Sequence, residues 1–274
     1  MSTKRTWIRA GIAALLVVTC SLIPVRARAQ EHASPRNAEV DARGARSVHI
    51  EAHAGSLRVE GRTGLSQVRI RGTARASARN MLGAIKLVAE RRGDVVFVKA
   101  DIPDQHGDFW DAIGGNSRYR GLDLVIEVPV SLPLEVADGS GEATFVNTGA
   151  LSLADGSGEI EIRMARGNVR VNDGSGAIDI DGVEGSVRID DGSGEIKARN
   201  VTGDVSVDTD GSGNISVAGV GGTMRVGNDG SGSIDVDRVG GNFVVSSDGG
   251  GSIRYATVKG TVDIPDQKKD RRRR

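Results

Sequence analysis

The chain has 274 residues, of which 38% are hydrophobic, 3% are aromatic and 39 are glycine. Its 36 basic and 36 acidic side chains cancel, and the single Cys20 excludes a disulfide framework. The zero net charge hides an asymmetry, because residues 30–267 carry 25 basic and 35 acidic side chains, whereas six of the last seven residues are basic. An acidic body repels phosphate, so we expect no nucleic-acid partner.

Residues 1–29 are predicted to be a signal peptide. A basic start precedes an apolar run at 10–18, and Ala27-Arg28-Ala29 gives the small-x-small pattern that a signal peptidase cleaves. We therefore expect an exported protein that resides in the periplasm or on the outer cell surface. A retained anchor and lipidation of Cys20 stay open as alternatives, although the run is short for a membrane span and Thr19 is a poor neighbour for an acylated cysteine.

The next part of the chain is predicted to be irregular. Residues 30–45 lack apolar periodicity and are interpreted as a flexible leader. Residues 46–136 are predicted to be an irregular β region that starts and caps the following repeats, since an uncovered sheet edge would recruit other strands. Within it we expect one short helix at 78–91 and alternating strands at 47–71, 95–99 and 122–128.

A long loop from Ile102 to Gly121 interrupts this region. It contains Phe109, Trp110 and Tyr119, which are three of the seven aromatic residues after the signal. Long loops in compact domains are often functional, so these three residues form the predicted binding site. The alternative is a cap in which the rings pack against the first coils.

Residues 137–265 contain a tandem repeat. Asp-Gly-Ser-Gly recurs with spacings of 17, 18, 18, 19 and 19 residues, and a variant Asp-Gly-Gly-Gly follows after another 19; the motifs begin at Asp138, Asp155, Asp173, Asp191, Asp210, Asp229 and Asp248. Such near-constant spacing is typical of a solenoid.

Each repeat contains two alternating runs, for example Glu159-Ile160-Glu161-Ile162 and Asn168-Val169-Arg170-Val171. Alternation predicts half-buried strands, and two short strands need stacked neighbours to bury a core. The sequence therefore predicts an all-β, β-helix-like solenoid of two-strand coils with about 18–19 residues per coil. At about 4.8 Å per coil, seven coils give a rod of roughly 30 Å, too thin for many aromatic rings.

The Asp-Gly-Ser-Gly corner is interpreted as a structural turn. Glycine adopts positive φ without penalty, and Asp and Ser side chains bond nearby amides. Stacking places the seven aspartates in one ladder, which raises calcium binding as the alternative. Residues 208–215 match the start of an EF-hand loop, but its twelfth position is Gly219 rather than Glu and no helices are expected beside it. No metal or other cofactor is predicted.

The stretch from Leu122 to Gly141, LDLVIEVPVSLPLEVADGSG, feeds pairs of Gly-x-Ile-x-Ile and Gly-x-Val-x-Val strands. Over residues 45–265 this pattern resembles the bacterial adhesin-like β-strand-repeat proteins, which contain a domain of unknown function. The resemblance implies an extracytoplasmic β-solenoid. It brings no catalytic residues, and the basic tail lies outside it.

No catalytic constellation is found in the sequence, so no enzyme is expected. His49, Glu51 and His53 would share a strand face, but two surface histidines are more often solvated than metal-bound. Some β-helix enzymes use acids on an outer sheet face. The outward acids of this chain lack the aromatic platforms of polysaccharide-cleaving enzymes; they are Glu142, Glu159, Glu161, Asp179, Glu195 and Asp235.

The leading hypothesis is a non-enzymatic exported envelope protein, in which a rigid solenoid presents a surface for adhesion to, or scaffolding of, an envelope or surface protein or glycan. The alternative is a periplasmic regulatory or stress-response binding module that contacts its partner through the aromatic loop. End-to-end filaments are a third hypothesis, which a cap at the N-terminal end opposes. Residues 266–274 are expected to be a disordered basic tail; the alternative is a contact with an anionic partner through Arg271, Arg272, Arg273 and Arg274.

Overall fold

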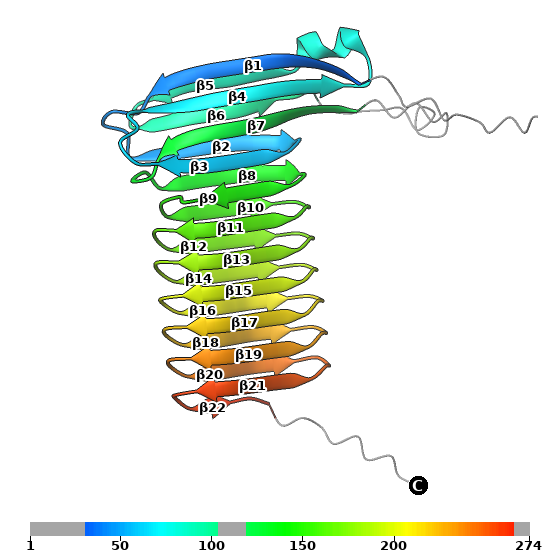
Figure 1. Cartoon of the computed structure of the whole chain (residues 1–274). Coiled ribbons are helices and arrows are strands. Elements are labelled where there is room, and N and C mark those ends of the chain that lie inside the picture. Colours follow the sequence, from blue (N-terminus) through cyan, green and yellow to red (C-terminus); the bar gives the residue numbers. More distant parts are fainter. Residues whose placement is uncertain (1–30, 104–118, 266–274) are drawn as a thin grey trace, which may run out of the picture.

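The computed structural model describes residues 31–103 and 119–265. They form two sheets of 11 strands each, between which the chain winds as a solenoid (Figure 1). Sheet A has the order β1-β4-β7-β3-β9-β11-β13-β15-β17-β19-β21, and sheet B has the order β22-β20-β18-β16-β14-β12-β10-β8-β2-β6-β5. The predicted all-β solenoid of two-strand coils is confirmed.

Each regular coil contributes one strand to each sheet, and all these strands pair in parallel. Sheet A receives β9 (Ala143–Val146), β11 (Ile160–Ala165), β13 (Ile178–Val183), β15 (Ile196–Val201), β17 (Ile215–Val220), β19 (Ile234–Val239) and β21 (Ile253–Val258). Sheet B receives β8 (Leu134–Ser140), β10 (Leu151–Asp155), β12 (Val169–Asp173), β14 (Val187–Asp191), β16 (Val205–Asp210), β18 (Met224–Asp229), β20 (Phe243–Asp248) and β22 (Val262–Asp263).

The register places like residues of successive coils above one another. Ile160, Ile178 and Ile196 are consecutive partners in sheet A, and all three are buried. The apolar residues of the alternating runs fill one hydrophobic core that extends from Val40 to Val245. The last coil differs, since Ile253 is only partly buried there.

The N-terminal strands cap the solenoid with antiparallel pairs. They are β1 (His32–Asp41), β2 (Ser47–Ala54), β3 (Leu57–Arg62), β4 (Gln67–Ala76), β5 (Lys86–Arg92), β6 (Val95–Asp101) and β7 (Arg120–Pro129). β1 pairs with β4, β4 with β7 and β5 with β6 in antiparallel fashion, whereas β2 and β3 join the parallel coils through β8 and β9. The strands expected at 95–99 and 122–128 are confirmed.

Two expectations for this cap were wrong. The predicted flexible leader at 30–45 contains the ten-residue strand β1, which is held by backbone pairing with β4 while its only buried residue is Val40. The predicted helix at 78–91 is a short 3₁₀ helix, η1 (Arg79–Ala84), followed by β5. The apolar residues after η1 lie in β5, which pairs antiparallel with β6. A helix at this position would leave the backbone groups along that edge of β6 unpaired.

No helix among the described residues is both long and apolar enough to span a membrane.

Candidate functional site

Only one of the three residues of the predicted aromatic site, Tyr119, lies among the described residues. Phe109 and Trp110 lie outside the described residues, as do Arg271 to Arg274 of the tail. Tyr119 immediately precedes β7 and is 43% exposed, and its backbone carbonyl accepts a hydrogen bond of 3.0 Å from the Ser77 amide. Its role in binding therefore stays a prediction.

The second candidate from the sequence was a metal site formed by His49, Glu51 and His53. Two of these side chains contact other protein groups instead. Glu51 accepts from Lys99 at 2.8 Å, and the His49 ring stacks on Phe97 with centroids 5.5 Å apart. His53 has a φ of 65° at a register shift between β2 and β8, which breaks the alternation that would align it with His49. Across residues 31–103 and 119–265, no group of three or more His, Cys, Asp or Glu side chains is placed to hold a metal ion.

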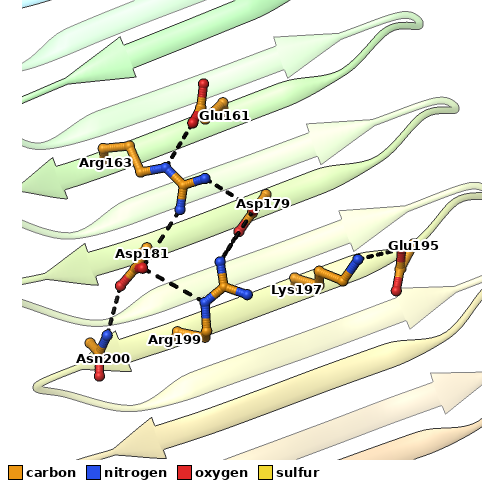
Figure 2. Close-up of polar contacts among 8 residues, drawn as sticks. All are labelled: Glu161, Arg163, Asp179, Asp181, Glu195, Lys197, Arg199 and Asn200. Atoms are coloured by element: carbon orange, nitrogen blue, oxygen red, sulfur yellow. Dashed lines mark hydrogen bonds and ion pairs between the residues drawn. The ribbon is translucent and has the colours of Figure 1, made fainter.

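The outer face of sheet A carries a network of ion pairs between coils (Figure 2). Arg163 on β11 donates to Glu161 on its own strand at 2.8 Å and to Asp179 on β13 at 3.1 Å, and lies 3.6 Å from Asp181. From the other side, Arg199 on β15 donates to Asp179 at 3.0 Å. Two acids on one strand are thus bound by arginines of the strands on both sides.

The same network joins the acidic outer face of β13 to basic and polar side chains of β15. Asn200 donates to Asp181 at 2.7 Å, and Arg199 lies 3.7 Å from the same carboxylate. The hydrogen bond that Arg163 donates to Glu161, followed by the charge of Asp179, raises the pKa of Arg163. Each exposed pair contributes only about 0.2–1 kcal/mol, so the network selects the neighbour and its register more than it stabilises the fold.

The outer face of sheet B is more open. A shallow groove of about 490 Å³ follows the starts of β8, β10, β12, β14 and β16, with Arg170 and Arg188 in its wall. Arg188 pairs with Asp208, and Arg170 lies 4.0 Å from Asp190. The face therefore presents arginines in a row whose charge is partly neutralised by acids of the following coil.

The aspartates of the repeat form the expected ladder, but they are buried. Asp138 is 8% exposed and Asp210 is fully buried, with the intervening rungs in between. Each aspartate of the ladder pairs in register with the aspartate of the next coil, from Asp138 to Asp248. Asp248, in the last position of the ladder, has no aspartate beyond it and is partly exposed. The corner therefore encloses a column of carboxyl groups inside the solenoid.

Hydrogen bonds satisfy these carboxyl groups only in part. One oxygen of Asp138, Asp173 and Asp191 accepts from an amide of the turn at 2.8, 3.3 and 3.1 Å, which confirms the predicted Asp turns there. Both carboxyl oxygens of Asp155, Asp210 and Asp229 are buried without a hydrogen-bond partner, as is the second oxygen of Asp138, Asp173 and Asp191.

This environment favours protonated carboxyl groups. Burial, reinforced by the charges of neighbouring rungs, raises the pKa of Asp138, Asp191 and Asp210 to about 6. The pKa values of Asp155, Asp173 and Asp229 are also raised, with burial as the largest cause. The spacing of the motif predicted that the aspartates stack in a ladder. It did not predict that their side chains point inward, because this direction depends on the geometry of the turn.

Glycine is required at the end of the motif for close approach between coils. Gly194 has a φ of +150°, and a Cβ atom there would lie 1.5 Å from the carbonyl oxygen of Gly176 in the preceding coil. The corresponding glycines of the other coils have the same geometry. The third residue of the motif is less constrained, since a Cβ at Gly250 would meet nothing within 4 Å.

A second periodic turn position escaped the sequence analysis. Seven residues near the ends of the sheet A strands have φ between 53° and 78° and recur with the period of the coils: Asn147, Met164, Gly182, Asn200, Gly219, Arg238 and Thr257. Asparagine and glycine tolerate this conformation, whereas methionine, arginine and threonine do not favour it. The mixed residue types hid the position, although its regular spacing was available as a signal.

The two ends of the solenoid differ. At the N-terminal end, β1 contains Pro35 and β5 carries Lys86, Glu90, Arg91 and Arg92, which are features that oppose further strand pairing. At the other end, β21 and β22 are the last strands of their sheets, and β21 has Arg254 as its only charged residue. Tyr255 on β21 is 49% exposed, with its ring 5.9 Å from that of Phe243.

No protein-family model and no curated protein matches the chain. Among solved structures, it is similar to a candidate cell adhesion protein from Clostridium sporogenes, with 15% identity, a TM-score of 0.31, and coverage of 86% of this chain and 99% of that one. A candidate lipid binding protein from Parabacteroides distasonis has 14% identity, a TM-score of 0.42 and coverage of 83% and 96%. A candidate adhesin from Bacteroides fragilis has 12% identity, a TM-score of 0.32 and coverage of 86% and 99%.

We take neither a ligand nor an activity from similarities at this level.

Proposed function

We propose that this chain is a non-enzymatic, exported envelope protein whose rigid solenoid presents a surface for adhesion or scaffolding. The observation that carries the proposal is the continuity of the core, which extends without a break from Val40 in the cap to Val245 near the last coil. Stacked coils that share one core resist bending, so side chains on the outer faces keep fixed spacings over the length of the rod. Fixed rows of charged groups suit recognition of another macromolecule.

The export signal predicted at residues 1–29 supports the location, and the charged rows on the outer faces support contact with a protein or glycan. Adhesion requires the solenoid to be outside the cell, whereas the alternative, a regulatory or stress-response binding module, would act in the periplasm. The location therefore separates the two versions of the function.

Protease shaving of cells that produce an epitope-tagged copy tests this. Digestion of the tag in intact cells is the result expected for a surface adhesin. Protection until the outer membrane is permeabilised would overturn surface adhesion and favour the periplasmic module. A periplasmic marker protein that stays intact in the first sample controls for lysis.

A further inference from the structure

The described part of the solenoid ends at two strand edges, β21 in sheet A and β22 in sheet B. In the coils before this end, the amides of Gly232 and Ile234 donate forward to the carbonyls of Gly250 and Ser252, at 3.0 and 2.9 Å. By the repeat, the equivalent amides on the last coil are those of Gly251 and Ile253. No strand follows β21 in sheet A among the described residues, so these donors face the position that a further rung would take.

The side chains of this last coil are arranged for another layer. Ile253, Val258, Val262 and Ile264 pack against the core from one side and are only partly buried. Their counterparts one coil earlier in sheet A, Ile234 and Val239, are 1% exposed because β21 covers them. A strand laid on β21 would bury Ile253 and Val258 in the same way, whereas Val262 and Ile264 belong to the edge of sheet B.

The positive charge on and beside β21 favours an added strand that carries acidic side chains. Arg254 on β21 donates to Asp235 on β19 at 2.6 and 3.0 Å, and its side chain is still 66% exposed. Lys259 follows directly after the strand, and six of the last seven residues of the sequence are basic. Within the solenoid, Arg163 pairs with acids on both its own strand and the following one, Glu161 and Asp179 (Figure 2). An acid on an added strand would engage Arg254 as Asp179 engages Arg163.

A second copy of this chain is the poorer occupant. Two such ends placed face to face would bring together two sets of Arg254 and Lys259, and like charges in register oppose pairing. The N-terminal end of another copy is no better, because Pro35 in β1 and the charged β5 protect its edges.

We propose that the open edge of β21 binds an extended acidic segment of another protein as an added β-strand. Backbone hydrogen bonds to the edge would supply affinity, and alternating apolar and acidic side chains would supply specificity. This inference rests on the proposed function, which places the partner in the cell envelope. It adds the binding site, the edge of β21, and the chemistry of the partner, an acidic strand.

The chain itself provides a suitable probe. Residues 175–183, SGAIDIDGV, form the turn and strand β13, whose Asp179 and Asp181 are bound by Arg199 of the next coil. A labelled peptide of this sequence is titrated with the purified full chain and followed by fluorescence anisotropy. A matched peptide with lysine at both aspartate positions reports the contribution of charge. We expect the acidic peptide to bind at least about tenfold more tightly than the lysine peptide.

Two variants locate the binding. Ile253→Pro removes the outward amide while sparing the backbone bonds from β21 to β19, and proline is tolerated on an open edge; it should weaken binding by about tenfold or more. Arg254→Ala should remove most of the preference for the acidic peptide. Arg225→Ala, which removes an equal charge from the exposed face of sheet B, is the control and should bind like the parent protein. Hydrogen exchange should slow at the Gly251 and Ile253 amides when the peptide is added.

Absence of saturable binding, or binding that Ile253→Pro leaves unchanged, would overturn the proposal. Equal affinity for the two peptides would overturn the acidic specificity. A concentration-dependent dimer in sedimentation that Ile253→Pro abolishes would replace the acidic strand by a second copy. Since the assay uses purified protein, it stands or fails independently of the shaving experiment, which tests location alone.

Discussion

The N-terminal cap and the regular coils are both all-β, yet they are stabilised in different ways. In the cap, β1 and β4 pair antiparallel over ten residues, and a Cβ added at Gly44, Gly64 or Gly93 in the turns would meet nothing within 4 Å. In the regular coils every corner stacks on the corner before it, and the backbone of Gly194 lies against that of Gly176. The coils consequently restrict residue type at their corners far more than the cap does at these three turns.

The pKa values of acidic side chains are shifted in opposite directions in the two regions. In the cap, the hydrogen bond from Lys99 lowers the pKa of Glu51, so the charged form is the stable one. In the coils, burial raises the pKa values of the aspartate ladder to about 6 at Asp191 and Asp210, so the neutral form there is favoured up to about pH 6. A change of pH therefore acts on the two regions with opposite sign.

The largest expected effect is the substitution Gly194→Ala. A Cβ 1.5 Å from the Gly176 carbonyl forces adjacent coils apart, and the positive φ adds strain. We expect a loss of about 4 kcal/mol or more in the free energy of unfolding, or failure to fold, measured by urea denaturation with circular dichroism.

Gly93→Ala in the turn between β5 and β6 is the matched control. Gly93 has a φ of +61°, but a Cβ there meets nothing within 4 Å, so the cost should be only about 1–2 kcal/mol from the backbone conformation. Equal losses for the two variants would show that close packing of corners does not separate the coils from the cap.

The next effect is the response of the aspartate ladder to pH. A carboxyl group whose pKa is raised to about 6 in the folded state stabilises the fold fully below the unfolded value near 4, and this contribution is lost as pH rises through about 6. Asp210→Asn mimics the neutral form. We expect it to stabilise the protein by about 1–3 kcal/mol at pH 7 and to have little effect at pH 4.

Glu51→Gln in the cap supplies the opposite sign. Its lowered pKa stabilises the folded state above the unfolded value and loses this contribution as pH falls, so the variant should cost stability at pH 7 and little at pH 3. Chemical denaturation of both variants from pH 3 to pH 8 measures the difference. A destabilised Asp210→Asn at pH 7 would mean that the ionised carboxylate is stabilised by contacts, such as a bound cation, that asparagine cannot make.

The difference between the regions also explains which parts of the structure the sequence predicted. In the coils, the period of Asp-Gly-Ser-Gly together with alternation specified the sheets, the inward residues and the parallel register. In the cap, β1 is a strand because β4 offers backbone partners, although its residues alternate only weakly in hydrophobicity, so local pattern did not reveal it. The inward aspartates and the open edge of β21 depend on contacts between coils, which spacing alone does not provide.

The smallest expected effect concerns the second turn position of the coils. Met164 has a φ of +57° and is 58% exposed, so its side chain contributes little burial to offset an unfavourable backbone conformation. Gly182 occupies the same position one coil later with a φ of +78°, and a Cβ there meets the nearest atom only at 3.6 Å. We expect Met164→Gly to stabilise the protein by about 0.5–1 kcal/mol, which is the left-handed penalty less the greater entropy of glycine in the unfolded chain.

Gly182→Ala should destabilise by about 1 kcal/mol, since no close contact adds to the conformational cost. Denaturation curves of the two variants compare this loosely packed turn with the tight Gly194 corner on the other side of the same coils. If Met164→Gly is destabilising instead, the methionine side chain holds adjacent coils together at that turn. Close contact between coils would then limit both corners, and the contrast with the cap would extend around the whole circumference of the solenoid.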